Sequence, residues 1–192
     1  MATHSNIIIE HKGSYKAIPF YDKSKKFIKP HNTNYMSVYC HYDGYVSGVG
    51  KHLYNHYQTK QKVLDLISGG NMSSINDSLT DCVYYSDYEY NQEWEDNKPT
   101  SFKSLEKYMS DNVWISYIYV FGLDNVWRLY TTVSIGESKW VVRNGKRRYK
   151  PAFQKLVFID TLENIFNNCP TNMDIDDYVY SLIEKKEEEN EI

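Results

Sequence analysis

The sequence has few cysteines and no long hydrophobic run. Cys40, Cys82 and Cys169 are far apart and odd in number, so they fit neither a disulfide framework nor the paired spacing of a metal site. The most apolar stretch, residues 113–123, is too short to span a bilayer. The chain also begins without the basic and then apolar pattern of a signal peptide. We therefore expect a soluble protein of a reducing cytoplasm.

An excess of positive charge is missing as well. The 192 residues include 22 Lys and Arg against 25 Asp and Glu, for a net charge of −3. This balance argues against a globally basic nucleic-acid coat protein but leaves room for a local basic patch. Tyrosine, in contrast, is abundant, with 19 copies. The tyrosine side chain combines an aromatic ring with a hydroxyl group, which suits a binding surface. A tyrosine-rich β-sheet is the alternative explanation of this composition.

The order of apolar segments and turns predicts an α+β fold in a single domain, residues 1–170, followed by a C-terminal helix with a frayed charged tail at 171–192. Strands are expected at 6–10, 15–20, 35–41, 82–85, 114–121, 126–133 and 139–143, and helices at 47–57, 60–68, 100–110, 161–166 and 174–188. Strands and helices do not alternate regularly, so we expect a mainly antiparallel sheet with helices packed on one face. Residues 22–34 are expected to form an inserted loop or hairpin, and 86–98 a long acidic loop.

One segment combines a strand end, a glycine-rich turn and a helix start. Its candidate ligand-binding residues are Tyr39, His41, Asp43, Gly44, Tyr45, Gly48 and Gly50. Backbone N–H groups at a helix start can bind an anion, such as the phosphate of a nucleotide. A tight turn that needs glycine dihedrals is the alternative. The glycine spacing fits neither a P-loop nor the G-x-G-x-x-G motif, so specific nucleotide hydrolysis is not supported.

Histidines in the same region are candidates for chemistry. His41 and Asp43 lie two residues apart at a strand end, so their side chains can share a face and form the general base of a nuclease or hydrolase. No nucleophile is paired with them, and a non-enzymatic role is favoured. His52 and His56 have a helical spacing that can chelate a metal, but His56 falls on the apolar face of the predicted helix, where we expect it to be buried. No metal and no cofactor are expected.

A second candidate region is a basic hairpin. The dipeptide Asn144-Gly145 predicts a tight hairpin turn, because both central residues of such a turn need positive φ. The five basic residues of this hairpin are Arg143, Lys146, Arg147, Arg148 and Lys150. With Trp140 and Tyr149 nearby, they could grip a phosphate backbone and stack on bases. A hairpin with solvated charges is the alternative.

The segment at 86–98 has the opposite charge. Its candidate partner-binding residues are Tyr88, Glu89, Tyr90, Glu93, Trp94, Glu95 and Asp96, and residues 81–97 contain no Lys or Arg. Large aromatic side chains can anchor a protein interface, and acidic groups complement a basic partner. A solvated acidic loop is the alternative.

Three segments together resemble a family of small proteins encoded by phages and prophages. They are THSNIIIE at 3–10, YCHYDGY at 39–45 with GVGK and HY at 48–51 and 56–57, and LISGGNMSSI at 66–75. The resemblance weakens after residue 75. This chain departs from the family pattern at Tyr42, where tryptophan is usual, and at Val46, where proline is usual.

The resemblance implies a phage accessory protein in the cytoplasm of an infected bacterium. Such proteins are often inhibitors of host defence, including anti-CRISPR proteins and binders of immune signalling nucleotides. Our leading hypothesis is a non-enzymatic inhibitor that binds a host defence protein through the acidic loop. The alternatives are a binder of a nucleotide signal at the glycine turn, and a nuclease or hydrolase built on His41 and Asp43. Nucleic acid at the basic hairpin and self-association are further partner hypotheses, and no membrane partner is expected.

Overall fold

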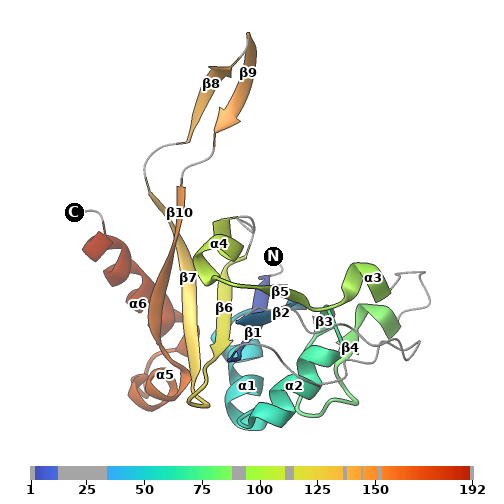
Figure 1. Ribbon diagram of the computed structural model, residues 1–192. Helices are drawn as coiled ribbons and strands as arrows, with labels where there is room; N and C mark the ends of the chain where they lie inside the picture. The colour runs from blue at the N-terminus through green and yellow to red at the C-terminus, as the bar shows by residue number, and fades with distance from the viewer. Residues whose placement is uncertain are drawn as a thin grey trace.

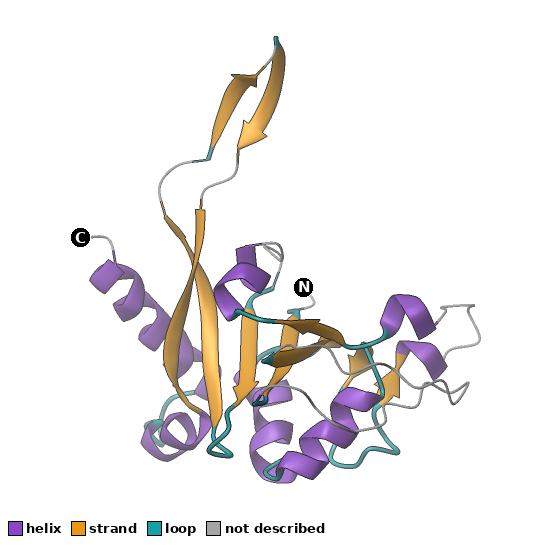
Figure 2. Cartoon of the chain, viewed as in Figure 1, coloured by secondary structure: helices purple, strands orange, loops and turns teal. Residues whose placement is uncertain are grey.

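The computed structural model describes residues 3–12, 34–87, 94–110, 115–135, 138–143, 145–150 and 153–190, and this part of the chain has an α+β fold (Figures 1 and 2). The main sheet contains β1 (Ser5–Glu10), β2 (Tyr35–Tyr42), β3 (Met72–Ser74), β4 (Val83–Tyr84), β5 (Thr100–Phe102), β6 (Tyr117–Phe121), β7 (Trp127–Ile135) and β10 (Phe153–Thr161). Its strand order is β10-β7-β6-β1-β2-β3-β4, and β5 pairs with β2. The strands β8 (Lys139–Arg143) and β9 (Lys146–Lys150) form a separate two-stranded ribbon.

Most strand pairs in the sheet are antiparallel, as expected, but β1 pairs with β6 in parallel and β2 pairs with β3 in parallel. β1 lies between β2 and β6, and Ile7, Ile8 and Ile9 are completely buried. A strand covered on both faces carries a continuous apolar run instead of an alternating one. The run of three isoleucines therefore marks β1 as a central strand.

Helices cover both faces of this sheet, unequally. The helical segments are η1 (Val46–Gly50), α1 (Lys51–His56), α2 (Lys60–Ser68), η2 (Tyr85–Asp87), α3 (Trp94–Asn97), α4 (Leu105–Ser110), α5 (Leu162–Asn168) and α6 (Ile175–Asn190). The larger core joins the sheet to η1, α1, α2, α5 and α6, as expected of helices on one face. A smaller core on the other face joins Ile8 and Ile118 to Leu105 of α4. None of the helices in the described part of the chain is long and apolar enough to cross a membrane.

The helix expected at 100–110 is a strand followed by a shorter helix. β5 takes Thr100–Phe102 and pairs with the start of β2, where Phe102 lies opposite Tyr35. The Phe102 ring stacks on both Tyr35 and Tyr108, with centroid distances of 5.5 and 4.1 Å. These long-range ring contacts favour the extended backbone over the local helical preference.

Other boundaries also differ from the predictions. The strand expected at 82–85 is shorter, because β4 ends at Tyr84 and η2 follows. The acidic segment expected as a loop at 86–98 contains the short helix α3. The strand expected at 15–20 lies outside the described residues, as does all of the expected insertion except Asn34.

The β8–β9 ribbon stands beyond the ends of β7 and β10, away from the helices (Figure 1). The Asn-Gly signal correctly predicted its position, since Gly145 has a φ of 72° between the two strands. The ribbon lies in the chain between β7 and β10, the antiparallel pair at one edge of the main sheet, and it forms a projection.

Candidate functional site

Three polar side chains meet at one end of the central strands and form what we call the histidine–tyrosine cluster (His4, Tyr39 and His41). The Tyr39 hydroxyl lies 2.8 Å from Nδ1 of His4 and 2.9 Å from Nδ1 of His41. The two imidazole rings are 4.7 Å apart between centroids. The β1–β2 register pairs Ser5 with Cys40, which brings the preceding His4 beside His41. All three side chains are partly exposed to solvent.

One imidazole of the cluster has a lowered pKa. A hydroxyl has one hydrogen, so Tyr39 can donate to one Nδ1 and must accept from the other. Burial and then the nearby His4 lower the pKa of His41 below 6.5, so near neutral pH the His41 ring is a neutral proton acceptor. Burial, followed by Cys40 and Tyr42, raises the pKa of Tyr39 above 10, which keeps its hydroxyl protonated. The cluster therefore combines groups suited to proton transfer.

The His41–Asp43 pair expected from the sequence is not formed. Among the described residues, the hydrogen bond of the His41 side chain goes to Tyr39, and the exposed Asp43 contributes its backbone carbonyl to Val49, 3.0 Å away. Sequence reasoning missed His4, which lies 35 residues before Tyr39. The available signal was its position shortly before the strand predicted at 6–10.

The glycine turn is packed tightly against the start of the chain. The Gly44 N–H donates to the Thr3 carbonyl at 2.8 Å, and the N–H groups of Gly48 and Gly50 donate to the Tyr45 carbonyl at 3.2 Å. A Cβ on Gly44 would lie 2.5 Å from the Thr3 carbonyl oxygen. The glycines thus allow a close backbone approach, which was the structural alternative to anion binding.

A carboxylate from the C-terminal helix lies at this turn. The Ser47 N–H donates to Oδ1 of Asp176 at 3.0 Å, and the Ser47 hydroxyl donates to the other oxygen. The helix expected at 47–57 begins one residue earlier, at Val46, and has no side-chain cap. The turn binds an anion of its own chain, so a phosphate would have to displace Asp176.

The predicted pair His52 and His56 is brought together with Asp77. Its Oδ1 lies 2.8 Å from Nδ1 of His52 and 3.0 Å from Nε2 of His56. The expectation of a buried His56 is wrong, because 37% of its side chain is exposed. The loop that carries Asp77 supplies a polar partner at the helix surface. Within the described ranges, no group of three or more His, Cys, Asp and Glu residues has a geometry that could hold a metal ion.

The register of the β8–β9 ribbon separates its side chains by face. One face pairs Trp140 with Tyr149 and Val142 with Arg147. The other backbone pairs in the register are Lys139 with Lys150, Val141 with Arg148, and Arg143 with Lys146. Because side chains alternate along each strand, the ribbon has an aromatic face (140, 142, 147 and 149) and, among its described side chains, an opposite face with three basic residues (139, 146 and 148) and Val141.

Both aromatic rings on this ribbon are available to solvent. Trp140 is 60% exposed and Tyr149 is 56% exposed. Their rings meet edge to face at 5.5 Å, and the Arg147 guanidinium lies 5.3 Å from the Trp140 ring centroid. The side chains of Lys146 and Arg148 are also exposed. Large exposed rings on a projecting ribbon are unusual for a solvated structure and favour a binding role.

The acidic partner-binding segment is largely outside the described residues. This applies to Tyr88, Glu89, Tyr90 and Glu93, and to the side chains of Trp94 and Glu95. Asp96, in α3, is exposed. Binding of a host protein through this segment therefore stays a prediction.

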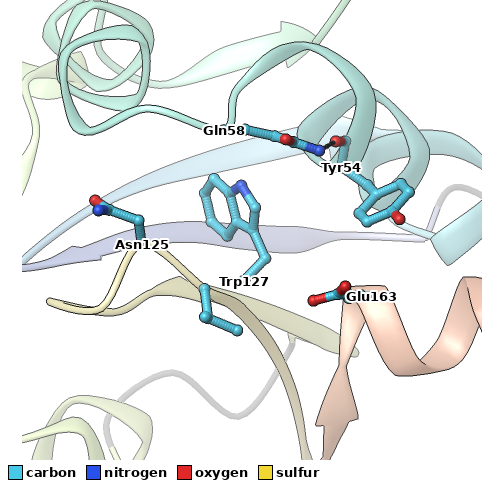
Figure 3. A pocket seen from close by; sticks show the side chains of 6 residues that line it. Tyr54, Gln58, Asn125, Trp127 and Glu163 are labelled. Atoms are coloured by element: carbon cyan, nitrogen blue, oxygen red, sulfur yellow. Dashed lines mark hydrogen bonds between the residues drawn. The ribbon is translucent and has the colours of Figure 1, made fainter.

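A small pocket, which the sequence did not predict, lies between α1, the β6–β7 turn and α5 (Figure 3). Its lining residues are Tyr54, Gln58, Asn125, Val126, Trp127 and Glu163. They come from three distant segments, and no spacing rule joins them.

Comparisons of the chain with protein-family models, with curated proteins and with solved structures each found no match. The resemblance to phage proteins stays a prediction, and the function has to be argued from the geometry.

Proposed function

We propose that the protein binds nucleic acid through the β8–β9 ribbon. The observation that carries this proposal is the two-faced ribbon, with basic positions on one face and exposed Trp140 and Tyr149 on the other. Lys and Arg side chains neutralise phosphates and release counterions. Aromatic rings provide stacking platforms for unpaired bases. Both kinds of contact are available on one projection.

The charge distribution of the chain supports this choice of surface. Residues 139–150 contain six Lys and Arg residues and no Asp or Glu, although the whole chain has a net charge of −3. The remainder of the chain is therefore acidic. A polyanion would be steered toward the ribbon and repelled by other parts of the surface.

Fluorescence anisotropy with labelled single-stranded and double-stranded DNA and RNA tests the proposal. The double variant Arg147→Gln/Arg148→Gln removes one charge from each face. We expect it to weaken binding about tenfold and to reduce the salt slope by about 2. Lys51→Gln/Lys62→Gln, which neutralises two exposed lysines elsewhere, is the matched control.

Replacement of the exposed ring distinguishes stacking from purely ionic contact. Trp140→Ala should weaken single-stranded binding by about 1 to 3 kcal/mol, whereas Trp140→Phe should retain most of the affinity. The proposal fails if the wild-type protein does not bind at low salt, or if the ribbon variants bind as well as the lysine control.

A second candidate function follows from the histidine–tyrosine cluster. β7 runs antiparallel to β6, so it leaves the sheet toward the ribbon at the end where β6 begins, and this is the end where His4 lies. RNA held by the ribbon would thus be on the cluster's side of the molecule. We infer that His41 and His4 could act as base and acid in metal-independent RNA cleavage.

The cleavage step balances without a further reactant. His41 takes the proton of a ribose 2′-hydroxyl, the 2′-oxygen bonds to the adjacent phosphorus, and the bond to the 5′-oxygen breaks. His4 supplies a proton to that leaving oxygen, and the products are a 2′,3′-cyclic phosphate and a 5′-hydroxyl. Incubation of RNA in the presence of EDTA tests this function. Cleavage that persists in His41→Ala, or no cleavage by the wild type, excludes it.

Inhibition of a bacterial defence system in an infected cell stays a prediction alongside these proposals. Binding to the nucleic acid that a defence system uses would be one route to such inhibition. Affinity purification from an infected host, followed by mass spectrometry of bound proteins and nucleotides, identifies the partner. Recovery of a host defence protein whose capture depends on Glu89 and Glu93 would instead support the acidic segment.

A further inference from the structure

The pocket between α1, the β6–β7 turn and α5 has a volume of about 200 Å³. Figure 3 shows Tyr54 and Gln58 on one side, Trp127 and Asn125 on another, and Glu163 at the start of α5. This size suits a side chain or a small organic group. The pocket lies apart from the ribbon and from the histidine–tyrosine cluster, so neither proposed function uses it.

Two hydrogen-bond donor groups in the pocket wall are already engaged. The Trp127 indole N–H donates to the Tyr57 carbonyl at 2.8 Å. The Gln58 amide N–H group donates to the Tyr54 carbonyl. Trp127 is only 4% exposed and contributes a small part of its ring to the pocket wall, and Gln58 contributes its amide oxygen. Both are electron-rich groups.

Glu163 adds a negative charge to this acceptor-rich wall. Its side chain is exposed, and no Lys or Arg is among the residues that line the pocket. Asn125, in the turn, has an amide that can present its oxygen. A ligand that brings only donors and positive charge would complement the wall, whereas an anion such as a phosphate would be repelled.

The walls are held in place before any ligand binds. Thr161 caps α5 by accepting a hydrogen bond from the Asn164 N–H at 3.1 Å, which positions the first turn that carries Glu163. The Tyr54 ring stacks on Phe166 of the same helix, with centroids 4.8 Å apart. A pre-formed site loses less conformational entropy when it binds.

We propose that this pocket binds a guanidinium group, such as an arginine side chain. Guanidinium is planar, has five N–H donors and no acceptor, and stays charged. It can form paired hydrogen bonds to the Glu163 carboxylate and lie against the partly exposed ring of Tyr54 as a cation–π contact, with the small accessible part of Trp127 beside it. The group could come from a small guanidine compound or from an arginine of a partner protein.

An NMR titration followed at the Trp127 indole N–H resonance tests the proposal. The probes are agmatine and a short acetylated, amidated Gly-Arg-Gly peptide. The matched control peptide contains citrulline, which keeps the shape but has no charge. We expect saturable shifts with the two guanidinium probes, with a Kd of about 1 mM, and at least tenfold weaker binding of the citrulline peptide. Similar affinity for agmatine and the arginine peptide assigns a small guanidine, and tighter peptide binding assigns a partner arginine.

Variants separate the pocket from non-specific charge effects. Glu163→Gln should weaken guanidinium binding at least tenfold, whereas Glu184→Gln, at an exposed glutamate of α6, should leave it unchanged. Gln58→Ala, a surface change that spares the fold, should weaken binding to a smaller extent. The proposal is overturned if neither guanidinium probe shifts the Trp127 resonance, if citrulline binds equally well, or if Glu163→Gln has no effect.

Discussion

Burial and the neighbouring imidazole of His4 both lower the pKa of His41. Both disfavour the protonated ring, and burial is the larger cause. Tyr39 links this ring to His4 through a single hydroxyl. The proton affinity of His41, in β2, therefore depends also on His4, which directly precedes β1.

Removal of the second imidazole tests this coupling. His4→Phe keeps a ring in place but removes the charge, so the pKa of His41 should rise toward its ordinary value of about 6.5 while remaining below it. An NMR titration of the imidazole resonances measures the change. His52→Asn, on α1, serves as the control and should leave His41 unaffected. A pKa of His41 that is unchanged or lower in His4→Phe would contradict the coupling.

Gly44 illustrates a steric requirement at the residue scale. In Gly44→Ala the new Cβ would lie 2.5 Å from the Thr3 oxygen and 2.9 Å from the His4 carbonyl carbon, both backbone atoms. We expect a loss of about 3 kcal/mol in the free energy of unfolding, from overpacking and a weakened hydrogen bond. Urea denaturation measures it.

Gly145 provides the comparison for this substitution. It has a φ of 72° but no atom within 4 Å of its ideal Cβ. Gly145→Ala should cost only about 1 kcal/mol, from the left-handed backbone conformation. Equal effects of the two substitutions would show that the Gly44 contact with the chain start is not rigid.

At the scale of an element, the β6–β7 turn is held by an ion pair. Two Arg128 nitrogens bond the two carboxylate oxygens of Asp124 at 2.9 and 2.5 Å. The hydrogen bond from Arg128 is the largest cause that lowers the pKa of Asp124 to about 2. Because the folded pKa is below the unfolded value, the stabilisation is present above about pH 4 and is lost as the pH falls toward 2.

Arg128→Gln tests the contribution of this ion pair to stability. The variant should be less stable than the wild type at neutral pH by less than about 1 kcal/mol, because half of the Asp124 side chain is exposed and solvent screens the pair. The difference should shrink as the pH falls from about 4 to about 2. Thermal unfolding at several pH values measures it, and a difference that is independent of pH would assign the effect to packing alone.

At the scale of the whole molecule, the protein consists of a two-core body and a projection. The β8–β9 ribbon forms its own two-stranded sheet. The strands on either side of it in the chain, β7 and β10, pair with each other in the main sheet. Since the ribbon pairs with itself and exposes its large side chains, it contributes little to the stability of the body.

Replacement of residues 138–150 by a short Gly-Ser linker tests this independence. We expect the body to unfold within a few degrees of the wild-type Tm, since the long β7–β10 pairing remains, and nucleic-acid binding to be lost. Differential scanning calorimetry and the anisotropy assay measure the two properties. A large drop in Tm would show that the ribbon supports the core.

Local features followed directly from the sequence. The prediction of a helix at 60–68 was confirmed as α2, with Thr59 accepting a hydrogen bond from the Lys62 N–H and Gly69 at its end. The prediction of a hairpin around Gly145 was confirmed too, since β8 pairs with β9 and Gly145 between them has a positive φ. Caps and two-residue turns depend on residues a few positions apart, so the residue types and their order are sufficient to specify them.

Only the tertiary structure decided which residues meet at each site. The β1–β2 register brings His4 to His41, α6 brings Asp176 to the glycine turn, and α5 brings Glu163 to the pocket. These contacts depend on strand register and helix packing between distant segments, which local patterns do not encode. The sequence by itself therefore determined an α+β chain with a basic, aromatic hairpin. The partners of its histidines and the acceptor-rich pocket were decided by the packing of the body.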